Sequence, residues 1–341
     1  MFGEQSIWLW LGFIGLVSVV LTLDLGVFNK DAHRISGKEA LLWTCLWVSL
    51  AIGFGGMVWQ FYGFEKAAEF MTGYLVEESL SVDNLFVFVL VFRHFKVVGK
   101  YQHRVLFWGV LGAIVMRAIF IFTGVALIQK FHWVIYLFGA FLIYSGLKLL
   151  FEKDEEKVKV HEEETEEVAE SLAVRLVKRF FAIAQNYDGQ KFFTIENGKR
   201  VATPLFLVLV VVETTDLVFA VDSIPAVLAI SKDPFIVFTS NIFAIMGLRS
   251  LYFLLADVID RFAFLKKGLS FILTFVGVKM LLPEISRWVS GESLSIPPPI
   301  SLAIIASVLF FSILISLFLA SKTEKKQTKN EVMPASEEVK V

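Results

Sequence analysis

The segment from Pro204 to Ile230 constrains the fold of this chain more than any other. It is apolar and long enough to cross a lipid bilayer, which takes about 20 mostly apolar residues, yet it contains the carboxylates Glu213, Asp216 and Asp222. A charged side chain at the bilayer centre costs at least about 2.5–3.5 kcal/mol. We therefore expect these three acids to face a cavity, a cation or one another, and not lipid.

Pro225 adds a second constraint to this segment. It has no N–H to donate to the carbonyl of Val221, one residue before Asp222. Irregular backbone at membrane depth occurs where it is buried in protein or lines a water-filled cavity. The segment therefore predicts a locally unwound helix whose carboxylates and freed carbonyl form a site for a hard cation.

The composition indicates an all-α polytopic membrane protein. The chain has 341 residues, of which 56% are hydrophobic, and its mean hydropathy is +0.69. The net charge of −1 and the lack of a basic patch between aromatics exclude nucleic acid as a partner. A single cysteine, Cys45, excludes an intrachain disulfide. The first ten residues lack a positive region and a cleavage site, so we read them as the start of a span.

About nine transmembrane spans are expected, and the basic residues orient them. With the N-terminus outside, the segments that face the cytoplasm contain 24 of the 32 Lys and Arg residues, and the outer segments contain four. Such a bias predicts an outer N-terminus and a cytoplasmic C-terminus. The expected spans are 7–28, 40–63, 71–92, 105–129, 132–151, 204–230, 235–259, 267–288 and 300–320.

The second half of the chain repeats the first. SVDNLFV (81–87) resembles AVDSIPAV (220–227), which aligns Asp83 with Asp222 and Glu77 with Asp216, 139 residues apart. Arg117 aligns with Arg249 in the next pair of spans, and Gly146-x-Lys148 aligns with Gly277-x-Lys279 in the third. A unit of three spans is odd, so its second copy enters the membrane inverted. Inverted repeats around a midplane site are common in transporters.

These features divide the chain into six parts. The cytoplasmic loop contains nine acids within 154–170, an amphipathic stretch (172–184) that we expect on the membrane surface, and a hairpin (191–203) with Asn197-Gly198 at its turn. The parts are two leading spans (1–70), a first three-helix repeat (71–151), the cytoplasmic loop (152–203), a second, inverted repeat (204–288), a ninth span (289–320) and a disordered tail (321–341).

Acids and amides in the two aligned spans are the candidate ion ligands. On an unbroken helix, residues seven apart share a face, so Glu77 with Asn84, and Asp216 with Ser223, each form a stripe. Asp83 and Asp222 join the stripes only where the helix is bent. The first of these spans supplies Glu77, Glu78, Asp83 and Asn84, and the second supplies Glu213, Asp216, Asp222 and Ser223.

Two intramembrane arginines, Arg117 and Arg249, are the candidate charge-balancing residues. Buried charges are normally paired, so each arginine can instead belong to a structural ion pair. Six carboxylates, with Glu78 included, exceed two arginines and leave a formal charge of −4, which favours a divalent cation, protons, or both. All five histidines lie at span edges or in loops, so Mg²⁺, Ca²⁺ and Mn²⁺ fit better than zinc or copper. The spacing does not choose among these three ions.

Several segments resemble the TerC family of integral membrane proteins and are most similar to its Alx-type branch. The resemblance covers roughly residues 7–320. It is carried by YLVEESLSVDNLFVF (74–88), GVLGAIVMRAIFIFTG (109–124), ATPLFLVLVVVETTDLVFAVDSIPA (202–226), DPFIVFTSNIFAIMGLRSLYFLL (233–255) and GVKML (277–281).

This resemblance implies nine spans in a bacterial inner membrane and export of Mn²⁺, in a family named for tellurite resistance. It points to Glu77, Asp83, Asn84, Glu213, Asp216, Asp222 and Ser223 as the ion-path positions and leaves out Glu78. The expectation is a metal-ion transporter, with proton exchange left open, that is not an enzyme and uses no organic cofactor. Its protein partners stay undefined.

Two other functions compete with transport. Asp83 and Asp222 in separate spans suggest an intramembrane aspartyl protease, but they lack the Gly-x-Gly-Asp context of that class, and further acids would disturb a shared proton. A scaffold that carries no ion, with the loop at 152–203 as its docking surface in a metal-stress complex, is the main alternative. Metal flux separates all three.

Overall fold

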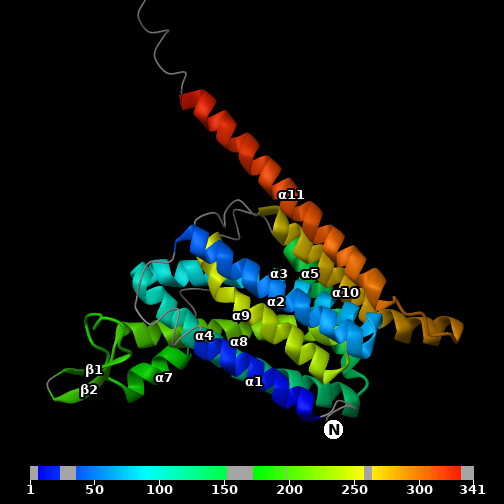
Figure 1. The fold of residues 1–341 in the computed structure, drawn as a ribbon, viewed down its shortest axis with the longest axis horizontal. Coiled ribbons are helices and arrows are strands. Elements are labelled where there is room, and N and C mark those ends of the chain that lie inside the picture. Colours follow the sequence, from blue (N-terminus) through cyan, green and yellow to red (C-terminus); the bar gives the residue numbers. More distant parts are fainter. Residues whose placement is uncertain (1–6, 24–35, 152–171, 197, 257–262, 332–341) are drawn as a thin grey trace, which may run out of the picture.

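The protein is a bundle of long helices with one small antiparallel hairpin (Figure 1). A computed structural model describes residues 7–23, 36–151, 172–196, 198–256 and 263–331, without the side chains of Asp83 and Asp222. The elements are α1 (Ile7–Leu23), α2 (Gly37–Tyr62), α3 (Phe64–His94), α4 (Gly99–Lys130), α5 (Val134–Phe151), α7 (Leu172–Phe180), β1 (Phe193–Glu196), β2 (Lys199–Ala202), α8 (Pro204–Ile230), α9 (Pro234–Leu255), α10 (Ala263–Ser290) and α11 (Pro298–Glu331).

Seven of the described helices are long and apolar enough to cross a membrane: α2, α4, α5, α8, α9, α10 and α11. The helix α1 is apolar but has only 17 described residues, and acids interrupt the apolar sequence of α3. The chain is therefore a helical membrane protein, as its composition predicts.

Helix boundaries agree with the expected spans best at α8, which covers 204–230 as predicted. The helix α3 begins at Phe64, seven residues before the expected start at 71. The prediction that residues 321–331 are disordered is wrong, because α11 continues to Glu331 and projects from the bundle (Figure 1). Lys, Glu and Gln dominate this stretch, and all three are good helix formers.

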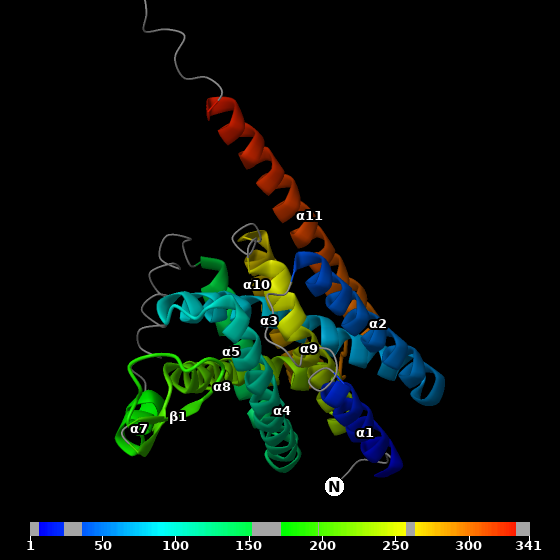
Figure 2. The same cartoon turned by 60° about the vertical axis from the view of Figure 1, so that its left-hand side comes forward.

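Helix α9 lies at the centre of the bundle. Its side chains are buried from Pro234 to Tyr252, because α2, α3 and α4 all pack against it (Figure 2). The helix α3 also contacts α8 and α11, and α4 also contacts α8. Four helices, α3, α4, α8 and α9, therefore surround one interior region.

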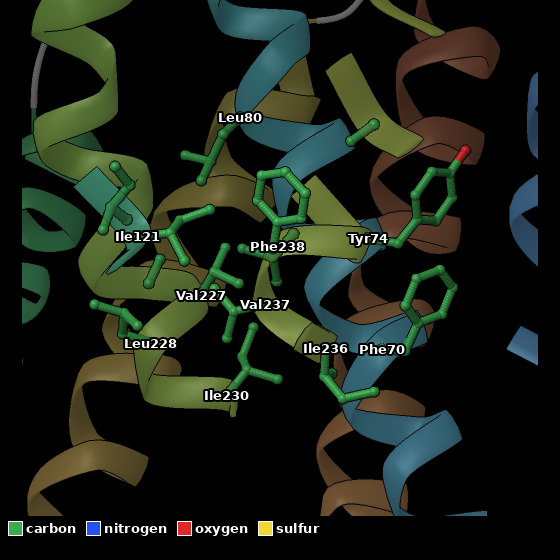
Figure 3. Packing of buried hydrophobic residues seen from close by; sticks show 14 of the residues in the cluster. Phe70, Tyr74, Leu80, Ile121, Val227, Leu228, Ile230, Ile236, Val237 and Phe238 are labelled. Atoms are coloured by element: carbon green, nitrogen blue, oxygen red, sulfur yellow. The ribbon is translucent and has the colours of Figure 1, made fainter. Parts of the chain in front are cut away.

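Apolar side chains fill most of the space between these helices. Figure 3 shows Leu80 of α3, Ile121 of α4, Val227 of α8 and Phe238 of α9 packed in one cluster. A second cluster lies toward the start of α8 and includes Val208. Polar groups within the bundle are therefore enclosed by hydrocarbon above and below.

The helices α5 and α10 pack through glycines. A Cβ at Gly277 would lie 2.9 Å from the carbonyl oxygen of Gly139, and a Cβ at Gly146 would lie 2.8 Å from that of Ser270. The Ser270 hydroxyl donates a hydrogen bond of 2.6 Å to the Gly146 carbonyl. Small residues that let backbones approach are the main source of helix association in lipid, where hydrophobic force between helices is absent.

The predicted hairpin is present at the end of the bundle where α8 begins. In the register of β1 and β2, Phe193 pairs with Ala202 and Glu196 with Lys199. This leaves a two-residue turn whose second residue, Gly198, has a φ of +73°, as an Asn-Gly turn requires. Its first residue, Asn197, lies outside the described residues.

Candidate functional site

The guanidinium of Arg117 is the centre of a buried polar cluster between α3, α4, α8 and α9. Arg117 projects from the middle of α4 and is 1% exposed. A buried cation must find partners of opposite charge, because its isolated transfer from water is very costly. Its partners therefore identify the acids that the fold brings together.

Two carboxylates, one from each of two helices, bind this guanidinium. The Nη1 of Arg117 donates to Oε1 of Glu77 on α3, and its Nη2 lies 3.6 Å from Oδ1 of Asp216 on α8. Glu77 is fully buried, and Asp216 is 4% exposed. The other carboxylate oxygen of Glu77 is buried without a hydrogen-bond partner in the described part of the chain. Two acids against one arginine leave a formal charge of −1.

Two neutral side chains complete the cluster. The Nη1 of Arg117 lies 3.1 Å from both the Ser223 hydroxyl of α8 and the Asn241 amide oxygen of α9. Asp216 and Ser223 thus share one face of α8, as their spacing of seven residues predicts. Asn241 also donates to the Val237 carbonyl at 3.1 Å, which turns its amide oxygen toward Arg117.

Asn241 is a residue of the cluster that the sequence reasoning missed. Its signal was available, since it is an amide within the apolar run DPFIVFTSNIFAIMG of a transmembrane helix. A polar group in such a place must find a partner inside the bundle. The sequence, however, does not say which helix faces Asn241.

Glu213 lies one turn before Asp216 on α8 and occupies a different place. Its carboxylate lies directly over Gly112 of α4, so that a Cβ at position 112 would overlap all three of its carboxylate atoms. Glycine at 112 therefore makes room for this acid inside the contact between α4 and α8.

Two further candidates, Asn84 and Arg249, make no hydrogen bond to the residues around Arg117 that the structure describes. Asn84 is buried on α3, with no hydrogen-bond partner for its amide nitrogen within the described residues. Arg249 is buried on α9 and makes none of the contacts described for Arg117. The side chains of Asp83 and Asp222 lie outside the described residues, so their predicted place in the site stays a prediction.

The unwound backbone predicted at Pro225 is not observed. The helix α8 is continuous from Pro204 to Ile230 with Pro225 inside it, and α3 is equally continuous from Phe64 to His94. A single proline removes one hydrogen bond of the ladder, and the remaining bonds keep α8 helical. The candidate site is therefore a set of side chains between intact helices.

Among the described side chains, no group of three or more His, Cys, Asp and Glu is arranged to hold a metal ion. Two of the acids that could complete such a group are bound to Arg117 instead. The described cluster is thus an ion pair with an excess acid, and Arg117 is the cation that occupies it.

Comparisons with known proteins agree with a membrane protein of this kind. The family described as "Integral membrane protein TerC family" matches residues 62–324. An "Uncharacterized membrane protein STKORF319" of Myxococcus xanthus is 50% identical over 309 residues, which cover 91% of this chain and 92% of that protein. A "Putative membrane-bound redox modulator Alx" of Escherichia coli strain K12 is 40% identical over 328 residues, which cover 94% and 97%.

A more distant relative, an "Uncharacterized membrane protein" of Rickettsia bellii, is 37% identical over 308 residues, which cover 90% of this chain and 96% of that protein. No solved structure matches the chain. The family match covers well over half of the sequence, and the helices α3 to α10 that enclose the Arg117 cluster lie within it. The chain therefore belongs to the TerC family of integral membrane proteins.

Proposed function

We propose that this protein exports a divalent metal ion, Mn²⁺ as the expected substrate, from the cytoplasm across the bacterial inner membrane. The observation that supports this proposal is the convergence of Glu77 and Asp216 on one guanidinium deep in the bundle. Ionisable residues inside a membrane protein generally mark ion pathways. The ion and its direction come from the family resemblance, while the acids indicate only a hard cation.

Arg117 acts in this proposal as a tethered cation that substitutes for the transported ion. It neutralises part of the charge of Glu77 and Asp216 when no metal is bound. A metal ion that takes those carboxylates must displace the guanidinium, whose alternative acceptors are the Ser223 hydroxyl and the Asn241 amide oxygen. The buried oxygen of Glu77 that has no hydrogen-bond partner is the first contact available to an entering ion.

A third acid of the proposed path is Glu213, which lies one turn from Asp216 on the same helix. With Glu213 included, the described cluster has a formal charge of −2, which one divalent cation would neutralise. Asp83, Asn84 and Asp222 complete the proposed ligand set, with Arg249 as a second charge-balancing residue. Protons that replace the metal on these carboxylates would couple export to proton entry.

We further propose that α3–α5 and α8–α10 form an inverted repeat. In such a repeat α3 corresponds to α8, and α4 corresponds to α9. The contact between α3 and α9 then has an equivalent in the contact between α8 and α4, and both contacts are extensive. Gly146 meets Ser270 and Thr274, whereas Gly277 meets Gly139 and Ile143. Gly277, Ser270 and Thr274 of α10 each lie 131 residues after Gly146, Gly139 and Ile143 of α5. The same contact is therefore made twice, with the two units exchanged.

Nine membrane spans follow if α1 and α3 also cross, in addition to the seven apolar helices. Two of the three acids in the middle of α3, Glu77 and Asp83, belong to the proposed path, so they count against lipid exposure and not against membrane insertion. An outer N-terminus and a cytoplasmic C-terminus complete the proposed topology, on the basis of the distribution of Lys and Arg.

Redox modulation, the role in the name of the Escherichia coli relative, has less support in this chain. Its 341 residues include one cysteine, Cys45, which is exposed on α2, so the chain has no pair of thiols for a disulfide. A scaffold without transport activity is the main alternative. It requires the buried excess acids to have no ionic role.

Flux in proteoliposomes tests the proposal. The purified full chain is reconstituted around a metal-sensitive dye, and Mn²⁺, Ca²⁺ and Mg²⁺ are added separately, with and without a pH gradient. We expect Mn²⁺ entry that depends on the protein and is reduced to the rate of empty vesicles by Asp216→Asn. Flux of another metal alone would reassign the substrate. No flux of any metal, from protein that binds to the membrane and is folded, would favour the scaffold.

A further inference from the structure

The helix α7 and the hairpin β1–β2 lie together at one end of the bundle (Figure 1, Figure 2). Asp188 and Glu196 are the acids between α7 and α8 in the described residues, and Asp188 already pairs with Lys191 at 3.0 Å. The surface therefore has a surplus of positive charge. Its exposed cations are Arg175, Lys178, Arg179, Lys191, Lys199 and Arg200.

Large apolar side chains are exposed among these cations. Phe180 at the end of α7 and Ile195 of β1 are each 75% exposed, and Phe181 is 39% exposed. Ile195 pairs directly with Arg200 across the hairpin, so an apolar and a basic side chain share one face. Basic residues interspersed with exposed Phe and Ile are typical of surfaces that lie at a membrane interface.

The hairpin is joined to the membrane-spanning part of the bundle by aromatic contacts. The ring of Phe206, in the first turn of α8, lies 4.7 Å from that of Phe193, which in turn lies 5.6 Å from Phe181. The guanidinium of Arg200 stacks over Phe193 at 4.6 Å. These rings continue from an apolar span to the exposed face, which places that face at the level where the span leaves the bilayer.

The orientation of α7 shows which of its sides is available. Val174 is fully buried and Val177 half-buried in the apolar cluster beside α8. The expectation that the apolar side of 172–184 lies on the membrane is thus wrong for these two residues, because that side packs on the protein. The opposite side presents Arg175 and Arg179, and Lys178 and Phe180 are also exposed at the end of the helix.

We infer that the end of α7 and the hairpin form a docking surface for anionic phospholipids of the adjacent leaflet. Lys178, Arg179 and Arg200 bind phosphate groups of the lipid heads, and Phe180 and Ile195 enter the boundary between headgroups and acyl chains. Each Lys or Arg near an anionic surface increases binding by roughly fivefold. This inference does not depend on the identity of the transported ion.

Quenching by brominated lipid tests the inference on the full chain. A bimane label is attached to Cys in an Ile195→Cys, Cys45→Ser background, and the protein is reconstituted with brominated phosphatidylglycerol or brominated phosphatidylcholine. We expect strong quenching in phosphatidylglycerol, at least roughly fivefold less in phosphatidylcholine, and weaker quenching as salt is raised. At matched ionic strength, inorganic phosphate should relieve the quenching no more than chloride does, because a phosphate-specific site would be occupied by the free ion, whereas a membrane surface responds only to ionic strength.

Paired substitutions separate local binding from net charge. Lys178→Gln with Arg179→Gln should reduce the quenching in phosphatidylglycerol by roughly half or more. The control pair is Lys130→Gln with Lys232→Gln. These two exposed lysines lie at the end of α4 and just after the end of α8, away from the hairpin. This pair removes the same charge and should leave the quenching in phosphatidylglycerol unchanged. The inference would be overturned by an absence of quenching, by equal quenching in both lipids, or by equal effects of the two pairs of substitutions. Relief of the quenching by inorganic phosphate beyond that by chloride at matched ionic strength would overturn it as well.

Discussion

Glu77 and Asp216 lie on different helices, α3 and α8, and contact the same guanidinium, that of Arg117. The sequence alignment of the two halves of the chain makes these acids equivalent positions. Their shared partner means that each one can be removed while Arg117 keeps a counter-charge. Stability and transport can therefore be separated by substitution at this site.

Asp216→Asn should abolish export while the protein still folds. The variant leaves a one-to-one pair of Arg117 and Glu77, which relieves repulsion between the two acids. We expect an unchanged protein level and melting temperature, with Mn²⁺ flux reduced at least roughly tenfold. Flux assays and thermal melts of the same preparation measure both. Transport at the parent rate would remove Asp216 from the ion path.

Glu78→Gln is a matched control for Glu77→Gln. Glu78 lies about 100° around α3 from Glu77, and its carboxylate is near position 247 of α9, away from the contacts of Arg117. We expect nearly normal export from Glu78→Gln and loss of export from Glu77→Gln. Equal loss from both would mean that the path is wider than the cluster around Arg117.

Arg117→Met should lower the protein level, since it leaves two buried carboxylates without their cation. Removing one partner of a buried pair costs about 3–5 kcal/mol in soluble proteins. The triple variant Arg117→Met, Glu77→Gln, Asp216→Asn has no charge in the cluster and should recover the level but not the transport. Western blots of membrane fractions measure the recovery. A triple variant as depleted as Arg117→Met would indicate a role for the arginine beyond charge.

Gly112→Ala should displace the Glu213 carboxylate. The added Cβ overlaps that group, and overpacking of this kind costs typically about 1–3 kcal/mol. We expect a lower melting temperature and reduced Mn²⁺ flux. Gly56→Ala on α2 is the control, because nothing lies within 4 Å of a Cβ there. A variant at 112 that matches the control in both measurements would show that Glu213 can move away at no cost.

Gly146→Ala and Gly277→Ala should destabilise the protein to a similar extent. In each case the Cβ would lie 3.0 Å or less from backbone atoms of the facing helix, α10 or α5. A loss of about 1–3 kcal/mol for each is expected from overpacking. Melting temperatures in detergent measure the two losses. Strongly unequal losses would contradict the proposed symmetry of the repeat.

Cysteines at positions 199 and 232 should react on opposite sides of the membrane. Lys199 lies on the hairpin before α8, and Lys232 follows the end of α8. In a Cys45→Ser background, an impermeant thiol reagent on intact cells should label Lys232→Cys and spare Lys199→Cys. The reverse pattern would invert the proposed topology, and labelling of both would mean that α8 does not cross.

The sequence predicts the helical class, the bounds of α8 and the hairpin, because apolar length and an Asn-Gly turn are local signals. It also predicts a shared face for Asp216 and Ser223, since helix periodicity is local as well. Which acids would meet Arg117 could not be predicted, because that depends on how four helices pack. Asn241 was missed for the same reason.

The error at Pro225 has a different origin. The missing N–H is certain from the residue type, but whether one lost hydrogen bond unwinds a helix depends on the helices packed around it. The continuation of α11 to Glu331 was missed because high polarity was taken as a sign of disorder. In that stretch, helix propensity had the stronger effect.

The start of α8 is hydrogen-bonded to the hairpin region, so the hairpin is connected through one helix to the cluster around Arg117. The Thr203 hydroxyl donates to the Lys191 carbonyl at 2.7 Å, and the Ala184 N–H donates to the Ala202 carbonyl at 2.8 Å. A rotation of α8 that separates Asp216 from Arg117 must therefore carry the hairpin with it. If the proposed export requires such a rotation, a fluorophore on the hairpin would change its signal with each cycle, and anionic lipid bound to the hairpin would resist the rotation.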